Sequence, residues 1–159
     1  MKFSNLLLLP LAFSSTVAGL PTGIEDSATN ALDKRAFSGS PVCHFAYRNH
    51  LAHFNNGIAE VRRLNRVIAF APRFCVRVAC NNNAGIAVCN DNPHRVINLH
   101  SNTIYDYYVR IAEGHGNCIH FGSGLAGQQF DTDGWNVIAI KMNCNAPSVW
   151  TVDQWPPQP

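Results

Sequence analysis

The sequence is poor in charge. Only 14% of its 159 residues are Asp, Glu, Lys or Arg, and the formal net charge is +2. A balance this mild does not indicate a nucleic-acid partner bound through bulk electrostatics. The chain has no N-x-S/T sequon, so N-glycosylation is not expected. Its one clearly apolar run, residues 6–13, is too short to cross a bilayer, so we expect no membrane span.

Complete catalytic and metal-binding motifs are also missing. H-E-x-x-H is absent, and residues 122–124 (G-S-G) lack the spacing of a nucleophile elbow. Residues 131–134 (D-T-D-G) resemble the start of a calcium loop, but Met142 stands where the twelfth-position Glu would be required. A hairpin turn is the better interpretation of D-T-D-G.

Histidines at metal-like spacing do not complete a site either. His50 and His53 share a helical face at i,i+3, but the usual third ligand is missing. His115 and His120 bracket Cys118, and a disulfide at that cysteine would remove the thiolate that zinc needs. We therefore expect no metal and no cofactor.

The N-terminus has the pattern of an export signal. Residues 1–19 combine a basic start, an apolar run and small residues at the end, as signal peptides do. Residues 20–35 are small, polar and acidic, a composition that does not fold alone, and they end in Lys34-Arg35. Kexin-type proteases cleave after such pairs, so we expect a secreted, extracellular chain that begins at Ala36.

The expected mature chain is rich in arginine and in cysteine. It holds nine basic residues, eight of them arginine and one Lys141, against seven acidic ones, which keeps its charge at +2. The even number of cysteines favours disulfides over a metal cluster, and fifteen pairings are possible. The six cysteines are Cys43, Cys75, Cys80, Cys89, Cys118 and Cys144. We expect a disulfide-bonded domain over 36–144 and a Pro- and Trp-containing tail over 145–159.

Periodicity predicts a helix over 46–69, interrupted by a turn at residues 55–57 (N-N-G), with a late strand over 67–70 as an alternative. Residues 74–80 and 86–89 alternate like two strands of a hairpin. In an unbroken strand Cys75 and Cys80 face opposite ways, so we expect them to enter different bridges.

The second half of the chain predicts a further helix and two more strands. Ser101 is placed to cap a helix that runs to about Glu113, with Gly114 as its stop. Strands are expected over 118–121 and 135–144. A Gly-rich stretch lies between them at 122–127, and its first three residues, 122–124, are expected to be a flexible loop. Together these patterns predict a monomeric α+β domain, with an antiparallel sheet of hairpins and two or more helices packed on one face.

Two groups of residues are candidates for chemistry or binding. A histidine pair with an arginine performs acid–base cleavage in metal-independent ribonucleases, and the chain has these residue types, although no spacing joins a particular pair. The candidates are His94, His100, His115, His120 and Arg110. For binding, exposed aromatic rings stack on sugars or fill a partner's pocket, unless the tail folds back and buries them. The candidates here are Trp135, Trp150 and Trp155.

Three segments carry a resemblance. Residues 80–92 (C-N-N-N-A-G-I-A-V-C-N-D-N), the helix with Ile104–Ala112, and residues 127–138 (G-Q-Q-F-D-T-D-G-W-N-V-I) resemble small secreted cysteine-rich proteins of filamentous fungi. That group often has a further cysteine just before the helix, where this chain has Leu99 and His100. The resemblance implies secretion and fungal origin, and its members are mostly candidate effectors without an assigned activity.

Three hypotheses follow. The first is a non-enzymatic effector or toxin-like protein that binds a protein or polysaccharide target outside the cell. The second is a small ribonuclease-like hydrolase, and the third is a binder of wall carbohydrate.

Overall fold

A computed structural model of the chain describes residues 36–113, 118–120, 122–154 and 156–159. The predictions for the signal peptide, the pro-segment and Lys34-Arg35 lie outside these residues. So do those for Gly114, His115 and Trp155. In the described part of the chain, no helix is both long and apolar enough to cross a membrane.

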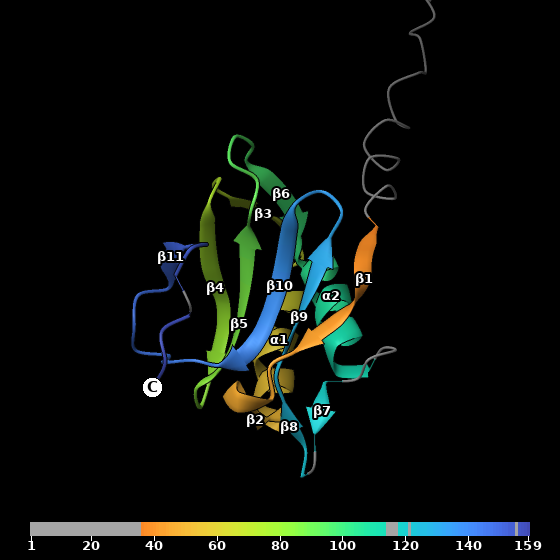
Figure 1. The fold of residues 1–159 in the computed structure, drawn as a ribbon, viewed down its shortest axis with the longest axis vertical. Helices are drawn as coiled ribbons and strands as arrows, with labels where there is room; N and C mark the ends of the chain where they lie inside the picture. Colours follow the sequence, from red (N-terminus) through yellow and green to blue (C-terminus); the bar gives the residue numbers. More distant parts are fainter. Residues whose placement is uncertain (1–35, 114–117, 121, 155) are drawn as a thin grey trace, which may run out of the picture. The chain divides into compact units, whose positions relative to one another are not determined.

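The main sheet has six strands, and every neighbouring pair in it is antiparallel (Figure 1). In spatial order the strands are β1 (Phe37–Cys43), β9 (Gly127–Asp131), β10 (Trp135–Lys141), β5 (Ala84–Asn90), β4 (Phe74–Asn81) and β11 (Val149–Thr151). The antiparallel α+β prediction is confirmed.

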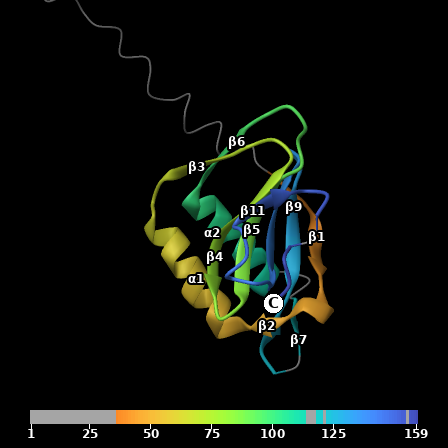
Figure 2. The same cartoon turned by 90° about the vertical axis from the view of Figure 1, so that its left-hand side faces the viewer.

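Two helices lie on one face of this sheet, as Figures 1 and 2 show. They are α1 (Leu51–Arg63) and α2 (Ser101–Glu113). A short 3₁₀ helix, η1 (Phe45–Tyr47), precedes α1. Two small antiparallel sheets complete the fold. One orders β2 (Asn49–His50), β8 (Gly124–Leu125) and β7 (Ile119–His120), and the other pairs β3 (Val67–Phe70) with β6 (Ile97–His100).

Alternation along β10 divides the apolar core into two parts. Trp135, Val137 and Ala139 join the cluster between the sheet and the helices. Ile138 and Ile140 point the other way and join a second cluster with the C-terminal tail. The sheet is therefore buried on both faces at its centre, which explains why β5 and β10 read as nearly continuous apolar runs.

Helix α1 runs through residues 55–57, so the predicted turn is wrong. Gly57 is buried against β4, where an added Cβ would lie 3.2 Å from the Cβ of Ala79. The glycine thus allows a close approach of helix and sheet and does not end the helix. The helix begins at Leu51, because η1 and β2 occupy the residues before it, and β3 confirms the alternative strand over 67–70.

The β4–β5 hairpin is confirmed, but β4 is not an unbroken strand, so its residues do not alternate regularly between the two faces of the sheet. Asn82 and Asn83 both have positive φ (48° and 61°), as a two-residue hairpin turn requires. A bulge shifts the register between Arg77 and Ala79. The extra residue returns Cys80 to the face of Cys75, in the cluster on the tail side. The prediction of opposite faces is therefore wrong.

Three disulfides join the six cysteines: Cys43–Cys118, Cys75–Cys89 and Cys80–Cys144. Cys75 and Cys80 do enter different bridges. The first bridge links the end of β1 to the segment before β7, the second links paired positions of one hairpin, and the third fixes the tail to β4.

The tail folds back onto the sheet. Its strand β11 pairs with the first three residues of β4, and Trp150 is only 6% exposed. The half-buried Arg77 holds the start of the tail, donating to the carbonyl oxygens of Asn143 (2.6 Å), Cys144 (2.8 Å) and Ala146 (2.9 Å).

We predict that Arg77→Met destabilises the fold by about 2–3 kcal/mol, because three half-buried carbonyls lose a charged donor. Arg73→Met is the matched control. Arg73 also contacts the tail, but through an exposed ion pair with Asp153, so its loss costs less than about 1 kcal/mol. Urea unfolding followed by circular dichroism measures both, and equal losses would contradict the role given to Arg77.

Candidate functional site

The acid–base candidates do not converge. His100 ends β6 and His94 precedes that strand, whereas His120 lies in β7. Figures 1 and 2 place these two strands at opposite ends of the main sheet. The guanidinium of Arg110 stacks 4.3 Å from the ring centre of Phe37. His115 lies outside the described residues. The described candidates His94, His100, His120 and Arg110 therefore do not form a His–His–Arg cluster.

A different pair of histidines does come together, at the start of α1. The rings of His50 and His53 have centroids 5.9 Å apart. Nε2 of His50 lies 2.9 Å from Oγ of Ser123, and Nδ1 of His53 lies 3.2 Å from Nδ2 of Asn82. Among the described residues, no three His, Cys, Asp or Glu side chains are arranged to hold a metal ion. The cluster is an exposed polar network made by three distant segments.

The Ser123–His50 contact resembles a nucleophile and its base, but the cap of α1 selects the other tautomer. Nδ1 of His50 accepts from the backbone N–H of Ala52 (3.4 Å), which caps α1. In the tautomer that makes this cap, Nε2 is the donor toward Ser123, and a donating nitrogen does not take up the serine proton. The Ser123 hydroxyl donates to the carbonyl of Gly122 (2.5 Å). This contact fixes the turn between β7 and β8, in a stretch predicted to be a flexible loop.

A second polar network crosses the sheet face opposite the helices, and no prediction from the sequence included it. Asn136 donates to the carboxylate of Asp91 (2.7 Å), Gln128 donates to Asn136 (2.9 Å), and His44 lies 3.2 Å from Oε1 of Gln128. The carboxylate only accepts, so it orients each amide in turn and makes His44 the donor at the far end. Asn136, a polar residue in the otherwise apolar start of β10 (W-N-V-I-A-I), is the sequence signal that could have indicated it.

Burial raises the pKa of Asp91, while the hydrogen bond from Asn136 and the charge of Arg73 act to lower it. The net direction is upward, so the folded protein holds a proton on this carboxyl to higher pH than the unfolded chain does. Burial therefore makes the charged form of Asp91 less favourable in the folded protein than in the unfolded chain.

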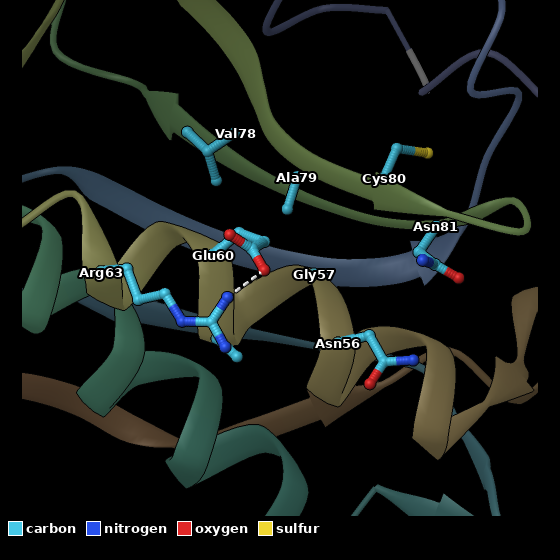
Figure 3. A pocket seen from close by; sticks show the side chains of 9 residues that line it. Asn56, Gly57, Glu60, Arg63, Val78, Ala79, Cys80 and Asn81 are labelled. Carbon is cyan, nitrogen blue, oxygen red and sulfur yellow. Dashed lines mark hydrogen bonds and ion pairs between the residues drawn. The ribbon is translucent and has the colours of Figure 1, made fainter.

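Two open grooves flank α1. The first has a volume of about 400 Å³ and lies between α1 and the part of β4 that β11 does not pair with. Figure 3 shows Val78 and Ala79 extending from β4 toward the helix, and Glu60 paired with Arg63 along it. Asn56 lies at the groove's end near the hairpin turn.

The second groove, of about 460 Å³, lies between α1 and α2. Arg62 stacks 4.6 Å from the ring centre of Tyr105 on its wall, and the hydroxyl of Tyr108 donates to Asn55 (2.5 Å). Burial, and then the charge of Glu113, raise the pKa of Tyr108, so this hydroxyl stays protonated. The two grooves share Ala59 and Arg63, so α1 has a groove on each side.

Neither of the two described tryptophan candidates, Trp135 and Trp150, exposes its ring for stacking on a sugar. Trp135 is 1% exposed and packs 4.3 Å from the ring of Tyr107, and Trp150 is covered by the tail that carries it. Trp155 lies outside the described residues.

Comparison of the chain with protein-family models, with curated proteins and with solved structures found no match.

We predict that Asp91→Asn makes the protein less sensitive to pH. Between the ordinary aspartate pKa of about 4 and the raised folded value, the native state binds more protons than the unfolded state, so stability falls as pH rises. Asparagine keeps an acceptor for Asn136 but has no such pH dependence. The variant should gain stability over the parent as pH rises from 4, in urea unfolding at several pH values. A relative loss over that range would mean that the fold favours the charged carboxylate.

Proposed function

We propose that the protein is a secreted effector or toxin-like protein of fungal origin, which acts by binding a protein or polysaccharide target outside the cell. The observation that carries the proposal is the pair of open grooves on either side of α1. They combine guanidinium, carboxylate, amide and aromatic groups on one surface, a mixture typical of a partner-binding site.

The disulfides support an extracellular place of action. Three bridges in so small a domain are typical of proteins that fold in an oxidising compartment. The fungal origin rests on the resemblance carried by residues 80–92 and 127–138. The preference for binding over catalysis rests on the separation of His94 and His100 from His120, and on the proton arrangement at His50 and Ser123.

Both helices are held firmly, which suits a binding surface. The imidazole of His50 caps α1, and that of His100 accepts from the N–H of Asn102 (3.2 Å) at the start of α2. The buried residues Phe54 and Ile104 anchor the helices to the sheet. A surface fixed in this way loses little conformational entropy when a partner binds.

We predict that Asn56→Trp, which fills the exposed end of the first groove, lowers target binding by at least about tenfold. Asn102→Trp places the same side chain on an exposed position of α2 outside both grooves and should leave binding unchanged. The measurement is binding of the fluorescently labelled exported protein to living cells and to isolated cell walls.

The same assay tests the enzymatic alternative. His94→Ala and His120→Ala should bind and act like the parent. Cleavage of RNA by the parent, with a bell-shaped pH profile and a loss in either histidine variant, would overturn the proposal.

A further inference from the structure

The end of α1 and the chain that leads from it into β3 expose both basic and aliphatic side chains. Residues 62–67 (R-R-L-N-R-V), called the basic turn below, contain three arginines and two aliphatic residues. All six are exposed: Leu64 to 44% and Val67 to 60%, the largest value among the exposed large apolar side chains of the described residues.

The basic turn is rigid in its backbone. Leu64 N–H donates to Val61 (3.2 Å), and Asn65 takes a left-handed conformation (φ 43°) that ends the helix. Ser101 then fixes the next residue twice, since its N–H donates to the carbonyl of Arg66 (2.9 Å) and its hydroxyl accepts from the Arg66 N–H (3.4 Å). The exposed aliphatic groups are therefore held out by the fold.

The charge of the basic turn stays positive after its neighbours are counted. Glu60 pairs with Arg63, and Asp106 lies close enough to Arg62 for that charge to act on its pKa. Arg62 also covers the ring of Tyr105. Three guanidinium groups thus stand against two carboxylates, with an aromatic ring beside them.

We infer that the basic turn docks peripherally on an anionic phospholipid surface. Guanidinium groups bind phosphate oxygens in pairs, and aliphatic side chains next to them enter the boundary between headgroups and acyl chains. A soluble polyanion would be attracted by the arginines but would gain nothing from Leu64 and Val67. The combination of both kinds of side chain favours the bilayer.

This inference goes beyond the proposed function, because lipid vesicles contain neither a protein nor a polysaccharide target. Failure of one is therefore distinguishable from failure of the other. The Asn56→Trp variant, which blocks the groove, should bind vesicles like the parent.

The test is co-sedimentation of the exported protein with vesicles of phosphatidylcholine alone or with 30% phosphatidylserine added, about a third of the lipid being enough to give a strongly negative surface. We expect binding only to the anionic vesicles. The triple variant Arg62→Gln, Arg63→Gln, Arg66→Gln should lose about fivefold for each arginine. Leu64→Ser with Val67→Thr should lose about tenfold, from lost apolar insertion.

Val42→Thr is the matched control, since Val42 is 46% exposed on β1, and it should bind like the parent. Equal binding to both kinds of vesicle, or an equal loss in the control, would overturn the inference. So would a loss in the arginine variant with parental binding of the Leu64/Val67 variant, because that result indicates simple attraction to any polyanion. Circular dichroism confirms that each variant is folded.

Discussion

Strand β4 carries a bulge between Arg77 and Ala79, and both layers of the molecule are built against the strand at this point. On one side Ala79 meets Gly57, so α1 lies close to the sheet. On the other side the extra residue turns Cys80 toward the tail, where it bonds to Cys144. Without the bulge, Cys80 would point at the helices, and the bridge to the tail could not form. The bulge thus sets which face each residue occupies, so that Ala79 packs on α1 and Cys80 reaches the tail.

The regular elements could be predicted because their signals are local. The hairpin, the second helix and the strand after D-T-D-G follow from alternation, helical spacing and turn chemistry. The predictions that were wrong concerned residues whose local structure is decided by tertiary contacts. Residues 55–57 read as a turn because Asn-Gly breaks helices in isolation, yet a partner strand used the glycine for close packing. The parity of Cys75 and Cys80 failed because a bulge leaves no clear mark in a sequence.

The candidate site was the least predictable part. Histidines suggest catalysis because of their chemistry, but here several of them serve the backbone. His50 and His100 each present Nδ1 to an N–H in the first turn of a helix, a position usually held by Ser, Thr, Asp or Asn. His44 ends the polar network that leads to Asp91. Composition alone cannot separate these uses, since the deciding fact is which atom of each ring meets a backbone group.

The arginines show that composition alone does not reveal which charged side chains are available to a partner. The net charge of +2 suggests a nearly neutral surface, yet the cations are not equally available. Arg77 is occupied by tail carbonyls and Arg110 by an aromatic ring. The sheet face opposite the helices is closed at its centre by the tail. Among the exposed cations of the described residues, Arg62, Arg63 and Arg66 lie together at the end of α1 and in the turn after it, whereas Arg48, Arg73, Arg95 and Lys141 lie in other parts of the chain. A lysine would serve poorly at the occupied positions, because it lacks the planar fork that spans several carbonyls or lies flat on a ring. The preference for arginine over lysine is thus explained in part by the contacts that Arg77 and Arg110 make within the fold, and in part by the arginines exposed around α1.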